Sequence, residues 1–207
     1  MPTHSPASTL SRRALLALAA LPAGLARPAF AQGAGAAFAL VKSTGDQLVA
    51  IVNGPGTAAE KRPKLRQVIE ANVDIDEIAR FVLGRFWRIA TPEQQKQYTP
   101  LFRDVLILNI SSKIGDYQGV KFTMGATHAR DDGEHVMTIV ERPNNPPANV
   151  EWVVANAARN VKIIDVIAEG TSMRLTQRSD YSSYLSRNNN NVQALIDALR
   201  QQAAENK

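Results

Sequence analysis

The spacing of the apolar residues changes after Gly115, and this change limits the chain to one fold class. Before Gly115, apolar residues recur every three or four positions, as on one face of a helix. From Val120 to Ala126, apolar and polar residues alternate, which is typical of a strand with one buried face. Three more strand-like segments follow before helical spacing returns at Ser172. The order predicts an α+β fold with N-terminal helices, a four-stranded antiparallel sheet and C-terminal helices. The expected strands are residues 120–126, 134–141, 150–157 and 161–168.

The helix with the clearest start signal lies just before the sheet. Thr91 can cap it with its hydroxyl, Pro92 suits the first helical position, and Gln94 completes a capping box. We expect this helix to run to about Ile114. The segment Val105 to Ile110, VLILNI, is apolar on nearly every side, so it is either a central core helix or the wall of a cavity for an apolar ligand. The other expected helices cover residues 38–52, a segment from 58 or 64, a segment from 74, 86–87, 172–187 and 192–202, after a frayed leader at 32–37.

The first 31 residues have the pattern of an export signal. Arg12 and Arg13 precede a short apolar run from Ala14 to Leu25, and Ala29-Phe30-Ala31 is a small-x-small cleavage site. The run is shorter than the ~20 residues that span a membrane. The paired arginines also suit the twin-arginine route. We therefore expect a cleaved signal at residues 1–31 and a single exported domain at residues 32–207.

Removing the signal also removes most of the positive charge. The whole chain has 24 basic and 19 acidic residues, a net charge of +5. Arg12, Arg13 and Arg27 lie in the signal, which has no acidic residue, so the rest of the chain is nearly neutral with 21 basic against 19 acidic residues. This balance gives no reason to expect nucleic-acid binding. The chain has no cysteine, which excludes disulfides and thiol chemistry.

The sequence shows no set of residues that would predict catalysis. His128 and His135 flank the first hairpin turn, where we expect them to be solvated, and no third residue nearby completes a metal site. The serines after residue 171 have no adjacent histidine to act as a base, and no glycine-rich phosphate loop is present. We expect neither an enzyme nor a cofactor or metal.

Two acidic residues of the last predicted strand and its end need partners. Asp165 lies in an apolar strand, where an unpaired carboxylate is costly, and Glu169 follows it. Arg85 and Arg178 are the candidate cations because each lies beside an apolar element. We favour a structural ion pair, and the alternative is an arginine that binds a phosphate headgroup.

Three segments of the chain are distinctive: LGRFWRIATPEQQKQYTPLFRDVL, IIDVIAEGTSMRLTQRSDYSSYL and VQALIDALR. They resemble the MlaC family of periplasmic phospholipid-shuttle proteins, also called the toluene-tolerance auxiliary family, and the resemblance spans roughly Val68 to Arg200. One departure is Asn188 to Asn191, where relatives usually carry a glycine pair. The matched motif residues are Leu83-Gly84-Arg85-Phe86-Trp87, Ala90-Thr91-Pro92 with Gln94, Asp165-Val166, Glu169-Gly170, Ser172-Met173 and Gln177-Arg178.

The resemblance implies a soluble periplasmic carrier that holds the acyl chains of a phospholipid in an apolar pocket. Its partners would be an inner-membrane ABC-type Mla transporter and an outer-membrane lipoprotein complex. Two acyl chains have on the order of 30 methylenes, and each costs about 0.8 kcal/mol to expose to water, so a carrier needs a dry pocket and no catalytic residue. We expect the tails between the helix from Pro92 to Ile114 and the inward face of the sheet. The candidate lining residues are Phe81, Phe86, Phe102, Leu106, Ile110, Phe122, Met124, Val136, Trp152, Val154, Ile164, Val166 and Met173.

Three alternatives stay open at this point. The chain could carry another apolar lipid, such as a hopanoid. It could be an isomerase or dehydratase on a cone-shaped α+β fold, with Asp165 as the only plausible buried acid. It could also be an exported adaptor with a solid core and no ligand.

Overall fold

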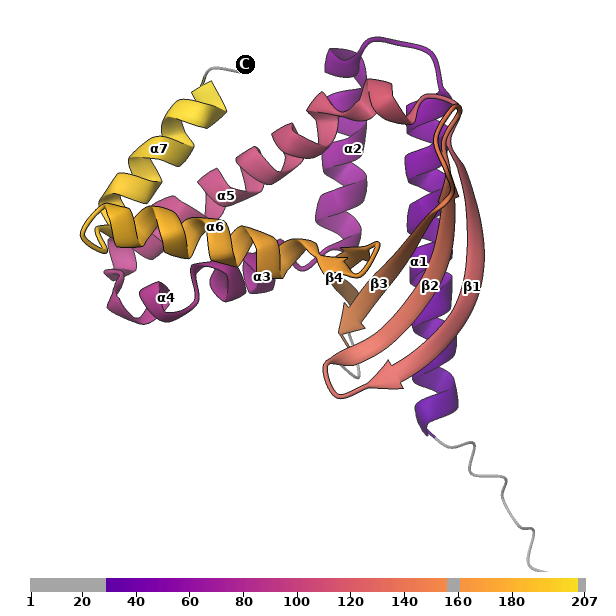
Figure 1. Cartoon of the computed structure of the whole chain (residues 1–207), viewed down its shortest axis with the longest axis horizontal. Coiled ribbons are helices and arrows are strands. Elements are labelled where there is room, and N and C mark those ends of the chain that lie inside the picture. Colours follow the sequence, from indigo (N-terminus) through magenta and orange to yellow (C-terminus); the bar gives the residue numbers. More distant parts are fainter. Residues whose placement is uncertain (1–28, 156–160, 205–207) are drawn as a thin grey trace, which may run out of the picture.

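The computed structural model describes residues 29–155 and 161–204, so the predicted export signal lies outside the described residues apart from its last three. The described chain has helices before and after an antiparallel sheet, which confirms the predicted α+β fold (Figure 1). The helices are α1 (Ala29–Asn53), α2 (Ala58–Asn72), α3 (Ile75–Leu83), α4 (Arg85–Ile89), α5 (Pro92–Ser112), α6 (Met173–Arg187) and α7 (Val192–Ala204), with a 3-10 turn η1 at Ile114–Tyr117. The strands are β1 (Lys121–Arg130), β2 (Gly133–Glu141), β3 (Ala148–Ala155), β4 (Lys162–Ala168) and β5 (Thr171–Ser172).

The sheet is a meander with the strand order β1-β2-β3-β4-β5. Its first four strands overlap the four predicted strands, although residues 156 and 157, the predicted end of the third, lie outside the described residues. The fifth, β5, has two residues and pairs with the end of β4, and it is too short for an alternating pattern to reveal it. Val136 pairs with Trp152, and Trp152 pairs with Val166, so these three side chains share one face of the sheet. We call this face, which also carries Phe122 and Val154, the inner face.

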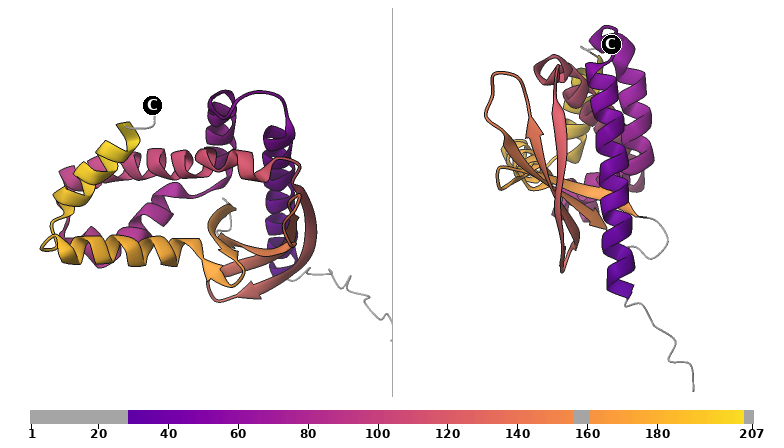
Figure 2. Two further views of the ribbon diagram at one scale, coloured as in Figure 1. Left: turned by 45° about the horizontal axis from the view of Figure 1, so that its top comes forward. Right: turned by 90° about the vertical axis from the view of Figure 1, so that its right-hand side faces the viewer.

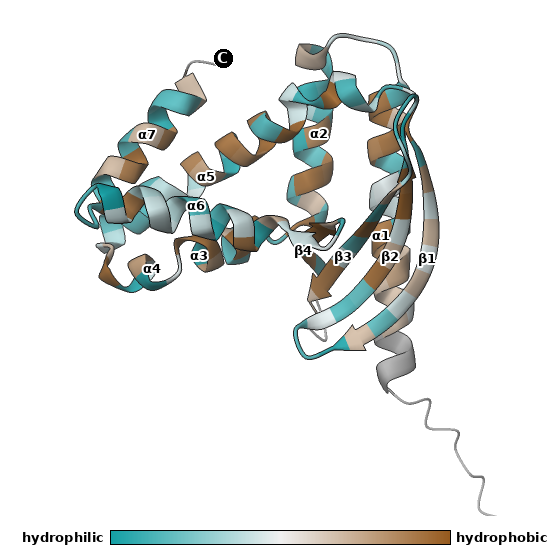
Figure 3. Cartoon of the chain, viewed as in Figure 1, coloured by the Kyte–Doolittle hydropathy of each residue, from teal (hydrophilic) through white to brown (hydrophobic). Residues whose placement is uncertain are grey.

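The buried apolar residues form two clusters. The helical cluster joins α2 through α7 and the C-terminal end of α1, and it has the fully buried Tyr98 and Leu185 among its members. The sheet cluster joins α1 to the inner face of the sheet. Val73 packs against both clusters and forms a parallel bridge to Ile163 of β4. Figure 3 shows the corresponding hydrophobic bands along α2, α5 and the strands.

The predicted start of α5 is confirmed. The Gln94 backbone N–H donates to Thr91 Oγ1 at 3.2 Å, and the Thr91 N–H donates to Gln94 Oε1 at 3.0 Å. In the apolar second half of α5, Ile107 is fully buried whereas Ile110 is 41% exposed. This half is therefore mainly a core helix of the helical cluster.

The element that covers the sheet is α1, which corrects the expectation that the long helix α5 does so. α1 lies along β1 and β2, whereas α5 packs against α2, α3 and α7 (Figure 2). The expected frayed leader at residues 32–37 is also wrong, because α1 begins at Ala29 and Ala37 is fully buried in the sheet cluster. Ala37 and Val41 are four residues apart, so they extend the apolar stripe of this helix toward its start.

Gly45 lets α1 approach the sheet. A Cβ atom at this position would lie 2.4 Å from Cε1 of Phe122, so any larger residue must displace the ring. Alanine is the better helix former by about 1 kcal/mol, but overpacking costs about 1–3 kcal/mol. We expect Gly45→Ala to lower the free energy of unfolding by about 1 kcal/mol net. Urea unfolding followed by circular dichroism measures the change.

The ring of Phe122 provides the control for this prediction. In the Phe122→Ala background the clash is absent, so adding Gly45→Ala should stabilise the protein by up to about 1 kcal/mol. A Cβ at Gly35, also in α1, would have no atom within 4 Å of it, and Gly35→Ala should not destabilise either background. Equal effects of Gly45→Ala with and without the Phe122 ring would contradict the clash.

Candidate functional site

The inner face of the sheet carries large apolar side chains that α1 covers incompletely. Val136 and Val154 are buried, whereas the side chains around them are only partly buried. The rings of Phe122 and Trp152 meet edge to face, with their centroids 6.2 Å apart. The predicted lining residues that the structure brings together here are Phe122, Met124, Val136, Trp152, Val154 and Val166. Because several of them keep accessible apolar surface, this face can gain further apolar contacts.

The other predicted lining residues lie elsewhere. Phe102 stacks against Tyr98 and Tyr181 deep in the helical cluster, and burial raises the pKa of both tyrosines above the ordinary value. Ile164 is buried but belongs to neither cluster, and Ile110 and Met173 are exposed. The residues that the structure places in or against the helical cluster are Phe81, Phe86, Phe102 and Leu106. The structure therefore does not bring all the predicted lining residues together between α5 and the sheet, because α1 is the helix that lies along β1 and β2.

Three buried oxygens near the contact of α1 with the sheet have no hydrogen-bond partner within the described ranges. They are Oγ1 of Thr44, Oγ1 of Thr127 and Oε2 of Glu134. Thr127 pairs with Val136 across β1 and β2, and Glu134 pairs with Val154 across β2 and β3, so both belong to the inner face. An unpaired buried oxygen costs about 1–3 kcal/mol. The three unpaired oxygens therefore offset part of the stability that apolar burial gives to the contact between α1 and the sheet.

The C-terminal end of α1 is held by polar contacts. The Asn53 side-chain amide donates to the Val120 carbonyl at 3.0 Å, and the Gly119 N–H donates to Asn53 Oδ1 at 2.8 Å. Lys61 Nζ of α2 donates to the Val52 carbonyl at 2.7 Å. These bonds fix the C-terminal end of α1 beside the start of β1. The part of α1 that carries Ala37 and Val41 is held against the inner face by apolar contacts.

The buried acid of β4 has an ion-pair partner, but the partner is not one of the predicted arginines. Asp165 is 5% exposed, and its Oδ2 lies 3.4 Å from Nε of Arg174. Its carboxylate also accepts hydrogen bonds from the Ser172 hydroxyl and from the backbone N–H groups of Arg174 and Val166. Glu169 accepts a hydrogen bond from the backbone N–H of Asn149 instead of pairing with an arginine. Asp165 therefore lies beside a cation, but that cation is Arg174 and neither of the predicted partners, Arg85 and Arg178.

The expectation that His135 is solvated is wrong. His135 is 2% exposed on the outer face of β2, and its ring nitrogens contact the carboxylates of Glu151 and, at 2.7 Å, Asp132. The hydrogen bond with His135, together with the charges of His135 and Arg174, holds the pKa of Asp132 below its ordinary value. These polar contacts join the β1–β2 turn to β3 and the start of α6. The sequence did not predict these contacts of His135, because acidic residues in a hairpin turn, such as Asp132, are usually solvated.

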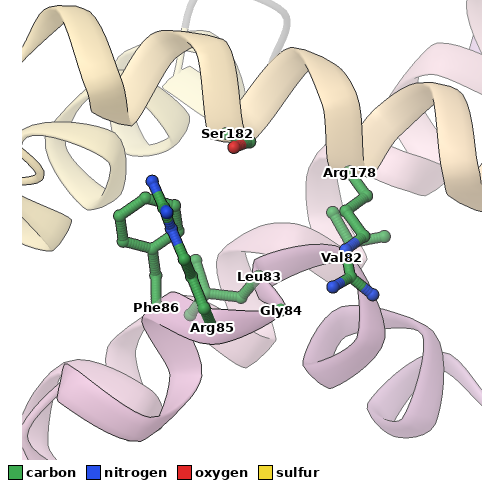
Figure 4. A pocket seen from close by; sticks show the side chains of 7 residues that line it. All are labelled: Val82, Leu83, Gly84, Arg85, Phe86, Arg178 and Ser182. Atoms are coloured by element: carbon green, nitrogen blue, oxygen red, sulfur yellow. The ribbon is translucent and has the colours of Figure 1, made fainter.

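A small hollow lies between α6 and the junction of α3 with α4 (Figure 4). It measures about 220 Å³ and adjoins a second hollow of about 330 Å³ around Arg88 and Ile89. Both are at or below the lower end of small-molecule sites, ~300–1,000 Å³, so neither encloses a lipid with two acyl chains. The residues that line the first hollow are Val82, Leu83, Gly84, Arg85, Phe86, Arg178 and Ser182.

Within residues 29–155 and 161–204, no group of three or more histidine, aspartate or glutamate side chains is placed to hold a metal ion. In the same part of the chain, no helix combines the length and apolarity needed to cross a membrane.

Comparison with known proteins gives three findings. The chain matches the model of the MlaC protein family over residues 42–201. It is similar to the toluene tolerance protein ttg2D of Pseudomonas putida, with 25% identity over 151 residues that cover 69% of this chain and 70% of that protein. Its fold is similar to that of the phospholipid-binding protein from Ralstonia solanacearum, solved in complex with a phospholipid, with a TM-score of 0.70 and 22% identity. That match covers 82% of this chain and 97% of the other.

Proposed function

Because this chain belongs to the MlaC family, as its sequence motifs predicted, we propose that it is a periplasmic carrier of phospholipids. It would bind the acyl chains and move them between an outer-membrane lipoprotein complex and the inner-membrane ABC-type Mla transporter. The name of its Pseudomonas relative and the phospholipid in the related Ralstonia structure support this proposal. The export signal predicted at residues 1–31 supports the periplasmic location.

The observation that carries the proposal is the partly covered inner face of the sheet. Phe122, Met124 and Trp152 are partly buried there, beside an α1 contact that includes unpaired oxygens. Acyl chains lying on this face would cover the accessible apolar surface. Transfer of two tails from a bilayer to such a surface is nearly neutral in free energy, whereas exposing about 30 methylenes to water costs roughly 24 kcal/mol.

We propose that the N-terminal half of α1 moves away from the inner face to admit the acyl chains. The C-terminal end of this helix stays anchored at Asn53. Three features favour this part of the molecule over the helical cluster. The α1–sheet contact has unpaired buried oxygens, its large side chains are only partly buried, and its polar anchors lie at one end. Segments with such features open at lower free energy than a closed apolar core.

The alternative of an enzyme that uses Asp165 is less well supported. Each oxygen of this carboxylate accepts a hydrogen bond, and the Arg174 guanidinium lies beside it. A general base needs an oxygen that can reach a substrate proton. The contacts of Asp165 favour a structural role.

Tryptophan quenching tests both the binding and its place. The chain has two tryptophans, Trp87 at the helical cluster and Trp152 on the inner face, so Trp87→Phe and Trp152→Phe each leave one reporter. Phospholipids brominated on their acyl chains should quench Trp152 in the first variant strongly and Trp87 in the second weakly. Quenching of Trp87 alone would move the tails to the helical cluster, and no quenching of either would contradict a carrier.

Native mass spectrometry of the protein from the periplasm identifies the cargo. A bound phospholipid supports the proposal, whereas a bound hopanoid or other polycyclic lipid would establish the alternative cargo. Protein free of any lipid, which also fails to take up lipid from vesicles, would favour the adaptor.

A further inference from the structure

We infer that Arg85 and Arg178 form a binding site for a phosphate group, in the hollow between α6 and the α3–α4 junction. The inference deepens the proposed function, because the phosphodiester of a carried phospholipid is one source of that group. Inorganic phosphate is the other source with the same chemistry. The two arginines come from α4 and α6, and Figure 4 shows them on different sides of the hollow.

Neither arginine has an anionic partner within residues 29–155 and 161–204. Among the described residues, Arg85 and Arg178 form no ion pair or hydrogen bond, and only aromatic rings stack against them. Arg174, one turn before Arg178, makes the contrast clear, because it pairs with both Asp165 and Asp132. The Arg174 guanidinium is thus engaged in ion pairs within the protein, whereas the N–H groups of Arg178 remain available to bind an anion.

Aromatic rings support both guanidinium groups without using their donors. The guanidinium carbon of Arg85 lies 4.8 Å from the ring centroid of Phe86, and that of Arg178 lies 4.9 Å from the ring centroid of Phe81. A guanidinium that stacks on a ring keeps its N–H groups free at the edge. Such an arginine can bind phosphate oxygens through two parallel hydrogen bonds.

Gly84 makes room for this arrangement. Its φ of 57° favours glycine, and a Cβ there would lie 3.0 Å from Nε of Arg178. The guanidinium therefore lies directly against the backbone of the Leu83-Gly84-Arg85 segment. This close approach explains why the motif has a glycine, and no larger residue, at position 84.

The remaining lining fits a phosphate ester. Ser182 lies four residues after Arg178, on the same face of α6, and contributes a hydroxyl that no other described residue bonds. Val82, Leu83 and Phe86 supply an apolar floor. The hollow of 220 Å³ has room for about seven waters at ~30 Å³ each, enough for a phosphate and its first linked atoms.

The first arm of the test uses lipid. Vesicles with equal amounts of phosphatidylglycerol and of a diacylglycerol with the same acyl chains are incubated with the protein, and the bound lipids are measured by mass spectrometry. Wild type should prefer the phosphate-bearing lipid. This preference should fall at least tenfold in Arg85→Gln/Arg178→Gln, fall less in Arg85→Lys/Arg178→Lys, and stay unchanged in Arg187→Gln, a control at the exposed end of α6.

The second arm uses soluble anions and does not depend on lipid carriage. Inorganic phosphate and glycerophosphoglycerol are titrated while the arginine Nε–H resonances are followed by NMR. A headgroup site is supported if the Nε–H resonances of Arg85 and Arg178 shift and the double glutamine variant loses the lipid preference. Loss of the lipid preference in that variant without resonance shifts also supports a headgroup site. Shifts with an unchanged lipid preference, or with no lipid uptake at all, assign the site to free phosphate. No shift and a lipid preference that survives the double glutamine variant would overturn the inference, whereas failure of wild type to take up any lipid contradicts only the proposed function.

Discussion

Asp165→Ala is expected to lower the free energy of unfolding by about 3–5 kcal/mol, because it breaks a buried ion pair from one side. The carboxylate accepts hydrogen bonds from the Ser172 hydroxyl and from the Arg174 and Val166 N–H groups, and it lies beside the Arg174 guanidinium. The Arg174 side chain is only 13% exposed, so its charge loses a partner that water replaces poorly. Urea unfolding at neutral pH measures the loss.

Two variants make this expectation specific. Asp165→Asn keeps the shape and one acceptor oxygen and should cost less than the alanine variant. Asp46→Ala removes an exposed partner of Lys42 and should change stability by at most about 0.5 kcal/mol. A loss below about 1 kcal/mol for Asp165→Ala would show that Arg174 is held by Asp132 alone. If Asp165→Asn stayed folded and abolished turnover of a small substrate, the enzyme alternative would gain its first support.

The class of the fold could be predicted because it depends on local periodicity. The alternation from Val120 to Met124 and the capping box at Thr91 and Gln94 need only neighbours in sequence, and the structure contains both. The alternation does not extend to Ala126 as predicted, because the register shifts between Met124 and Thr127 and leaves Ala126 exposed. The sequence could not show which helix covers the sheet. The segments of α1 and α5 both offer apolar stripes, and only the tertiary arrangement decides which stripe meets the inner face.

The same limit applies to the polar residues of the site. The need of Asp165 for a cation followed from its apolar strand, but the choice of Arg174 depends on the tight β4–β5 turn that brings the first turn of α6 back to β4. His135 lay beside a turn in the sequence, and nothing local showed that Glu151 of the next strand would approach it. Arg85 and Arg178 were predicted as partners of Asp165 and Glu169, and the sequence could not reveal that neither arginine has an acidic partner among the described residues.

Tyr98→Ala should be the most damaging single change in the helical cluster, with an expected loss of about 3–5 kcal/mol in the free energy of unfolding. Tyr98 is fully buried, its hydroxyl donates to the Ala79 carbonyl at 3.0 Å, and its ring meets those of Trp87, Phe102 and Tyr181. It therefore joins α3, α4, α5 and α6, and no single neighbour can fill the space that it leaves. Thermal and urea unfolding followed by circular dichroism measure the loss.

Tyr98→Phe separates the ring from the hydroxyl. It keeps the packing and loses one hydrogen bond, so it should cost only about 0.5–1.5 kcal/mol at neutral pH. Burial raises the pKa of Tyr98 well above 10.0, so the folded protein holds its proton where the unfolded chain releases it. The stability that this proton contributes is present below about pH 10 and declines as the pH rises above it. The stability difference between wild type and Tyr98→Phe should therefore shrink above pH 10, and a difference that stays constant to pH 11 would mean that Tyr98 ionises in the folded state as readily as in the unfolded chain.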